Sequence, residues 1–295
     1  MNWNPSPTEI VRQFDSIASI HSFVRDRQAD GQTVGLVPTM GALHEGHLSL
    51  VRRARDENET VVVTIFVNPT QFAAGEDLQA YPRPIEQDLD CLAAEQVDAV
   101  FMPDHSTMYP DGYGTFVQPP PIAHVLEGKH RPTHFRGVAT IVLKLLHVIP
   151  ADAAYFGQKD FQQLRVIETM VQDFNCSTRI VRCPIVRDPD GLALSSRNAY
   201  LTDTQRRVAL SLSRGLAGVA AQVNDGVGDI PQLERTLRES MAEADQIDYA
   251  CIVDTETMMP ITELGGSAIA VVAARIGNTR LIDNLILPNK LKPLS

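Results

Sequence analysis

Short apolar runs alternate with amphipathic helical patterns through the first two-thirds of the chain. The run at residues 60–67 has almost no polar interruption, which is typical of a strand covered on both faces. Further strands are predicted at residues 34–37, 98–102, 153–156 and 179–185. Apolar residues three or four positions apart predict helices at residues 48–56, 85–95, 136–148 and 160–174.

Strands separated by helices predict an α/β fold, a Rossmann-like doubly wound parallel sheet with helices on both faces. Ligands of such sheets bind beyond the carboxyl ends of the strands. The loops that follow predicted strands are therefore the candidate ligand contacts. They lie at residues 38–47, 68–72 and 157–160.

The pattern changes at the turn signal of residues 188–191, Asp-Pro-Asp-Gly. After it the sequence predicts a smaller α+β domain, so we expect domains at residues 1–186 and 187–295. Helices are predicted there at 204–223 and 230–245, and strands at 248–253, 268–274 and 279–286. Residues 103–132 are rich in Pro, Gly and His and predict a long loop or flap.

Composition narrows the class of protein. The 295 residues are 44% hydrophobic and carry a formal net charge of −10, which makes the chain a poor general binder of nucleic acid. The four cysteines form no close pair, so we expect free thiols of a reducing cytoplasm. The polar first ten residues do not resemble a secretory signal, and no apolar stretch is long enough to cross a membrane.

Two histidines, His44 and His47, stand where the loop after residues 34–37 meets a helix. Their three-residue spacing places both imidazoles on one face of a helical turn. Taken alone they are compatible with an ordinary pair near a helix end. A zinc site needs another spacing and a third ligand, and is disfavoured. The third interpretation is a phosphate site, in which imidazoles donate to anionic oxygens at a positive helix end.

Two more segments carry phosphate-type donors. Lys159 follows Gly157 at a predicted strand-to-helix junction, and Ser195, Ser196 and Arg197 follow the turn at 188–191. Each segment alone is compatible with an ordinary surface or capping loop. Together with His44 and His47 they resemble the two signatures of class I adenylate-forming enzymes, which makes ATP the expected ligand.

Four motifs then identify a closer resemblance. Residues 38–47 (PTMGALHEGH), 66–72 (FVNPTQF), 157–160 (GQKD) and 195–198 (SSRN) resemble the pantoate–β-alanine ligase family in order and spacing over about residues 30–200. Leu194 departs from the family, which more often has Met. That exchange preserves volume and apolar character.

The resemblance implies an ATP-dependent condensation of pantoate with β-alanine to pantothenate, AMP and pyrophosphate through a pantoyl adenylate. The family is usually dimeric and apolar stretches of the N-terminal domain hint at self-association, so a homodimer is expected. Mg²⁺ is expected mainly because phosphate oxygens bind it. Charge, cysteines and hydropathy indicate a cytoplasmic protein that binds neither nucleic acid nor membrane. The C-terminal domain is expected to close over ATP, because the adenylate must be shielded from water.

The resemblance also implies roles for particular residues. His47, His44, Lys159 and Arg197 are the expected catalytic residues, and Gln71 and Gln163 the expected pantoate ligands. The expected ATP contacts are Met40, Gly41, Ala42, Leu43, His44, Glu45, Gly46, His47, Gly157, Gln158, Lys159, Asp160, Val186, Leu194, Ser195, Ser196 and Arg197. Tyr81 and Asn68 are second-tier candidates. Asp88 is a candidate Mg²⁺ ligand, although an ordinary exposed helix aspartate is the favoured interpretation.

Three other functions remain open at this point. A nucleotidyl transferase of the same fold would stop at a nucleotide-linked product. An aminoacyl-tRNA synthetase is disfavoured, because the chain is acidic and only about 100 residues follow the second signature, with no basic anticodon-binding region evident. A non-catalytic regulator would bind ATP, or zinc through His44 and His47, without turnover.

Overall fold

The computed structural model describes residues 11–73 and 76–288, and within them the chain forms two compact units. The second unit consists of residues 121–130, 159–165 and 185 onward, and the first contains the rest. The main boundary lies close to the one expected after residue 186, but two earlier segments also belong to the second unit. The first ten residues, where no secretory signal is predicted, lie outside the described residues.

The first unit is built on a six-stranded sheet in the order β1-β4-β3-β2-β5-β6. All neighbouring strands run parallel, which confirms the Rossmann-like prediction. The strands are β1 (Arg12–Phe14), β2 (Val34–Thr39), β3 (Thr60–Ile65), β4 (Ala99–Phe101), β5 (Ala153–Gly157) and β6 (Arg179–Cys183). The strand order reverses between β2 and β5, so the ligand crevice is expected at their carboxyl ends.

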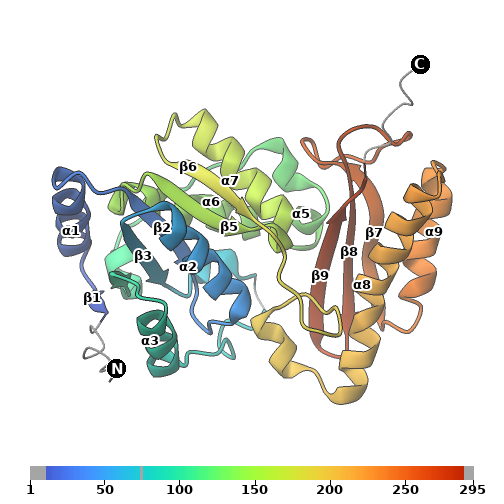
Figure 1. Ribbon diagram of the computed structural model, residues 1–295, viewed down its shortest axis with the longest axis horizontal. Coiled ribbons are helices and arrows are strands. Elements are labelled where there is room, and N and C mark those ends of the chain that lie inside the picture. The colour runs from blue at the N-terminus through green and yellow to red at the C-terminus, as the bar shows by residue number, and fades with distance from the viewer. Residues whose placement is uncertain (1–10, 74–75, 289–295) are drawn as a thin grey trace, which may run out of the picture. The chain divides into compact units, whose positions relative to one another are not determined.

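Helices cover both faces of this sheet (Figure 1). Apolar residues of α2 (Glu45–Glu57) and α3 (Ile85–Ala94) share one core cluster with the strands. On the opposite face α1 (Ile17–Ala29) contacts β2 and α6 (His134–Val148). The helix α7 (Phe161–Asp173) follows β5 after the short 3-10 helix η3 (Gln158–Asp160).

The structure corrects three details of the prediction. The hydrophobic pattern does not predict β1 or α1. The segment 103–132 is not one long loop, because it contains α4 (His105–Met108), η2 (Pro121–His124) and α5 (Glu127–His130). The helix α2 begins at Glu45 instead of 48, because the His44 side chain accepts a backbone N–H and caps it.

The second unit has an antiparallel sheet in the order β7-β8-β9. The even-numbered residues 268–276 of β8 share one core cluster with the helices α8 (Asp203–Asn224) and α9 (Ile230–Ser240). Ile269 and Val271 share another cluster with η2 and the start of α7. This alternation explains why segments 121–130 and 159–165 belong to this unit. Its elements are η4 (Ser196–Tyr200), α8 (Asp203–Asn224), α9 (Ile230–Ser240), β7 (Gln246–Asp254), β8 (Ala268–Ile276) and β9 (Thr279–Ile286). None of the helices within the described ranges is both long and apolar enough to cross a membrane.

Candidate functional site

The loop after β2 is held by internal hydrogen bonds. Gly41 and Ala42 have left-handed backbone angles, with φ of +78° and +50°. The amide of Gly41 donates to Thr39 Oγ1 at 3.1 Å, and that hydroxyl donates to the carbonyl of Thr64 at 2.6 Å. A Cβ on Gly41 would lie 3.0 Å from both Asp88 and Ile65, so glycine fits this position best.

Asp88 of α3 fixes the next two residues of the loop. Its carboxylate accepts the backbone N–H of Ala42 at 2.8 Å and of Leu43 at 2.7 Å. The side chain is only 1% exposed, so the interpretation as an exposed helix aspartate is wrong. Burial raises the pKa of Asp88, and the two amides oppose that rise. Because both oxygens are engaged inside the protein, Asp88 is poorly suited to bind Mg²⁺.

The two histidines form a reciprocal cap at the start of α2. The amide of Gly46 donates to His44 Nδ1 at 3.1 Å, and the amide of His44 donates to His47 Nδ1 at 3.3 Å. An imidazole nitrogen that accepts a hydrogen bond carries no proton, so each neutral ring carries its proton on Nε2. The two ring centroids lie 4.0 Å apart, so the imidazoles are direct neighbours at the start of this helix.

Most of the backbone amides of this loop are already occupied. Gly41, Ala42, Leu43, His44 and Gly46 donate their N–H groups within the protein. A loop that cradles phosphate through its backbone presents such groups to the ligand instead. These five amides are thus engaged inside the protein, so the phosphate donors expected in this segment are mainly side chains.

The second unit brings Lys159 and Ser195 together. Both line one small cavity of about 10 Å³, along with Asn198 and Asp283. The carbonyl of Lys159 accepts a hydrogen bond of 2.8 Å from Asn284 of β9, and its ammonium lies 3.8 Å from Asp160.

A short hairpin carries Ser195 into this position. Leu194 donates its N–H to the carbonyl of Val186, and Gly191 (φ +97°) makes the predicted turn. Ser195 caps η4 by accepting the N–H of Arg197 at 3.3 Å. Arg187 anchors the hairpin, because its guanidinium donates to both carboxylate oxygens of the buried Asp283.

The backbone carbonyl and the side-chain amide of Gln71 both make contacts within the first unit. Its carbonyl accepts from His134 Nδ1 at 2.8 Å and from Arg131 Nη2 at 3.3 Å. Its side-chain Oε1 accepts from Asn68 Nδ2 at 3.0 Å, and its Nε2 lies 3.0 Å from Met40 Sδ. Gln163 is half-buried on α7, and the described part of the chain offers its side chain no hydrogen-bond partner.

Comparison with known proteins decides the family. The model of the pantoate-beta-alanine ligase family matches residues 12–286. The chain belongs to the pantoate–β-alanine ligase family. A pantothenate synthetase of Rhodopirellula baltica is 53% identical over 277 residues, which cover 93% of this chain and 98% of that relative. One of Koribacter versatilis is 52% identical, with 94% and 96% covered.

Solved structures agree. The pantothenate synthetase of Thermus thermophilus superimposes with a TM-score of 0.90 at 41% identity, covering 94% of this chain and all of that one. The pantoate-beta-alanine ligase of Francisella tularensis, complexed with beta-gamma ATP and beta-alanine, gives a TM-score of 0.77 at 38% identity, covering 94% and 97%.

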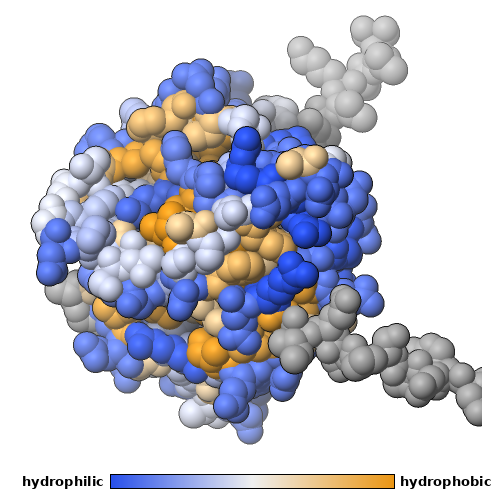
Figure 2. Space-filling view, turned by 90° about the vertical axis from the view of Figure 1, so that its left-hand side faces the viewer, coloured by the Kyte–Doolittle hydropathy of each residue, from blue (hydrophilic) through white to orange (hydrophobic). Residues whose placement is uncertain are grey.

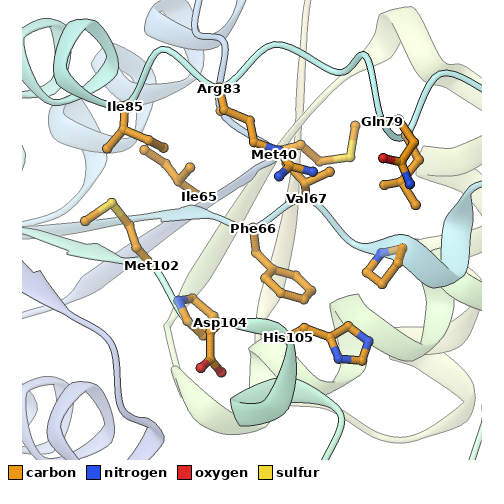
Figure 3. Close-up of a pocket in the computed structure, with 14 residues that line it drawn as sticks. Met40, Ile65, Phe66, Val67, Gln79, Arg83, Ile85, Met102, Asp104 and His105 are labelled. Carbon is orange, nitrogen blue, oxygen red and sulfur yellow. The ribbon is translucent and has the colours of Figure 1, made fainter.

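This pantoate–β-alanine ligase family member has a further pocket of about 720 Å³ at the carboxyl ends of β2, β3 and β4. Figure 3 shows Arg83 entering it from the loop before α3, and Asp104 and His105 on the opposite side. Met40 and Gly41 line it, but Gln71 and the two histidines do not. Its volume falls within the range of small-molecule sites, and its lining combines apolar side chains with polar and charged ones.

Sequence reasoning missed the residues that hold the loops of this ligase-family fold. Arg131, Asp283 and Asn284 have no motif that points to them. Asn68 followed by Pro69 is a recognisable signal, because an asparagine before proline often makes a side-chain turn. The described residues contain no group of three or more His, Cys, Asp or Glu side chains placed to hold a metal ion.

Proposed function

We propose that this protein condenses pantoate with β-alanine in two steps at the expense of ATP. Pantoate carboxylate attacks the α-phosphate, pyrophosphate leaves, and the amine of β-alanine then displaces AMP from the pantoyl adenylate. The observation that carries this proposal is the family match over residues 12–286, which contains every predicted site residue. The relative from Francisella tularensis supports it, because the crystal structure of that protein is a complex with beta-gamma ATP and beta-alanine.

His44 and His47 are proposed to stabilise charge on the phosphate oxygens during the first step. Their Nδ1 atoms accept backbone N–H groups, which holds both rings in place and puts the ring proton of each neutral imidazole on Nε2. Such preorganised donors cost no reorganisation when charge develops, and removal of one typically costs about 3 kcal/mol of transition-state stabilisation. Lys159, Ser195, Ser196 and Arg197 are the other proposed donors to ATP.

Pantoate is proposed to bind through Gln71 and Gln163. An amide offers both a donor and an acceptor, which suits a ligand with two hydroxyls and a carboxylate. Gln71 also has its backbone and its side chain held, which fixes its position before the substrate arrives.

Mg²⁺ is proposed to bind mainly through the phosphate oxygens of ATP and water. It needs only one or two protein carboxylates in such sites. Asp88 does not fit this role, because both of its oxygens accept loop amides. Asp88 is therefore not among the proposed Mg²⁺ ligands.

We also propose a cytoplasmic homodimer. The four unpaired cysteines suit a reducing compartment. Figure 2 shows hydrophobic surface gathered in a hollow of the face on which β1 and α1 lie, a feature typical of interaction sites. Light scattering coupled to size exclusion tests the dimer, and a monomer at micromolar concentration contradicts it.

Closure of the second unit over ATP is proposed as well, because the adenylate hydrolyses if water reaches it. Solution scattering with and without ATP and pantoate tests this. An unchanged scattering profile would count against closure.

Pyrophosphate exchange tests the proposed function. Labelled pyrophosphate should enter ATP when pantoate is present and β-alanine is absent. Exchange without subsequent pantothenate formation would favour a nucleotidyl transferase. No exchange by a folded preparation would favour a non-catalytic ATP-binding protein.

A further inference from the structure

Tyr109, directly after α4, reaches the turn that carries Gln71. Its ring is almost completely buried, and its hydroxyl donates to Asn68 Oδ1 at 2.8 Å. Thr70 Oγ1 lies 3.2 Å from the same hydroxyl. Tyr109 comes from the segment for which the sequence predicts only a loop, and no step of the proposed reaction uses it.

The side-chain amide of Asn68 links the Tyr109 hydroxyl to Gln71. Its Oδ1 accepts from the hydroxyls of Tyr109 and Thr70, so its Nδ2 must face the other way. There Nδ2 donates to Gln71 Oε1 at 3.0 Å and to the carbonyl of Gly137 at 3.3 Å. Reversing the Gln71 amide would set its NH₂ group against that of Asn68, so the Gln71 orientation depends on Asn68.

The backbone around this turn leaves it little room to adjust. A Cβ on Gly137 of α6 would lie 2.3 Å from the carbonyl oxygen of Thr70. The turn therefore packs directly on the helix backbone. Asn68 is 1% exposed, so water cannot easily replace a lost partner.

Tyr109 is itself held by aromatic contacts. Its ring meets Tyr113 edge to face, 5.0 Å between centroids, and the Lys144 ammonium lies 4.4 Å from the centre of the Tyr113 ring. Burial raises the pKa of Tyr109 to about 12, so its hydroxyl is a donor at neutral pH.

We infer that Tyr109 is a positioning residue for pantoate: its hydroxyl orients Asn68, and Asn68 fixes which atoms of the Gln71 amide donate and accept. The inference rests on the proposed function, since it takes Gln71 to be a pantoate ligand. A tyrosine needed only for packing would serve equally well as phenylalanine. A positioning hydroxyl predicts a defect confined to one substrate.

The test is Tyr109→Phe, with Tyr113→Phe as the matched control. Both changes remove one phenolic oxygen from the same aromatic cluster, but the Tyr113 hydroxyl has no hydrogen-bond partner among the described residues. Steady-state kinetics with each substrate varied give the KM values for pantoate and ATP, and thermal unfolding gives Tm. We expect Tyr109→Phe to raise the pantoate KM about 3- to 10-fold, because that is the effect of losing one hydrogen bond. The ATP KM should stay within about twofold, and Tyr113→Phe should change neither value.

Gln71→Ala separates failure of this inference from failure of its premise. A raised pantoate KM in Gln71→Ala but an unchanged one in Tyr109→Phe overturns the positioning role and leaves the pantoate site standing. An unchanged pantoate KM in Gln71→Ala overturns both the pantoate site and the positioning role. Equal rises in both KM values with a lowered Tm in Tyr109→Phe would show a purely structural role. Absence of pantoate-dependent pyrophosphate exchange in the unaltered enzyme would instead contradict the proposed function.

Discussion

Replacing Asp88 by asparagine removes a charge and one acceptor without changing the volume of the side chain. The carboxylate accepts the N–H groups of Ala42 and Leu43 at 2.8 and 2.7 Å, and these two residues lead directly into His44. Asparagine keeps one oxygen but presents its NH₂ group to the second amide. One hydrogen bond is thus lost, and two donors are left facing each other in a buried site.

The size of the effect follows from these contacts. A hydrogen bond to a charged group contributes about 1.5–3 kcal/mol, and an amide left without an acceptor adds to the loss. We expect Asp88→Asn to lower the free energy of unfolding by about 2–3 kcal/mol. For a unit of this size that corresponds to a Tm lower by about 4–12 °C. Turnover should fall about tenfold or more, because a displaced loop misplaces both imidazoles.

Thermal unfolding in Mg²⁺-free buffer and pyrophosphate exchange across a range of Mg²⁺ concentrations measure the two effects separately. Asp90→Asn is the control, because Asp90 is an exposed acid on the same helix. The reasoning is refuted if Asp88→Asn keeps its Tm in Mg²⁺-free buffer and regains full exchange at high Mg²⁺. That outcome would return Asp88 to the role of metal ligand.

Three further predictions concern other contacts. Gly137→Ala should lower the free energy of unfolding by about 1–3 kcal/mol, since the added Cβ overlaps a carbonyl oxygen, and urea unfolding measures it. Asp283→Asn breaks the two-point contact with Arg187, which anchors the hairpin that carries Ser195. The KM for ATP should therefore rise more than the KM for pantoate, and equal KM values for enzyme and variant would contradict this. Burial raises the pKa of Asp248, but the contact with Arg280 outweighs burial and the pKa is lowered overall. A lowered pKa means that the ionised carboxylate stabilises the fold above about pH 4, and that this stabilisation is lost as the carboxylate is protonated in acid. The difference in unfolding free energy between the protein and its Arg280→Met variant should therefore narrow below about pH 4. A difference that stays constant with pH would contradict a lowered pKa of Asp248.

Periodicity predicted the elements that bury complete faces. The strand β3 is buried along its whole length, β8 is buried at all but one residue, and α8 has a clear amphipathic pattern, so burial determines these elements. The strand β1 is three residues long with two exposed, and α1 buries only three side chains, so neither produces a clear pattern. The segment 121–130 belongs to the second unit through contacts distant in sequence, such as Glu127 with Arg280.

The sequence points to the proposed site residues through their chemistry, but it does not show the contacts that hold them. His44, His47, Lys159 and Ser195 carry recognisable donors in recognisable loops. Gln71 and Gln163 were accessible only through the family resemblance, because a glutamine in a loop has no distinctive pattern. The contacts that hold these residues join positions as distant as Lys159 and Asn284, or Ala42 and Asp88, and only the folded chain shows such pairs.

Transfer of oxygen from pantoate to AMP tests the central claim most directly. Pantoate labelled with ¹⁸O in both carboxylate positions is converted in the presence of ATP and β-alanine, and the products are analysed by mass spectrometry. Attack on the α-phosphate followed by displacement of AMP predicts one ¹⁸O in AMP and one in the amide carbonyl of pantothenate. Label in pyrophosphate, or unlabelled AMP formed together with pantothenate, would contradict the adenylate mechanism.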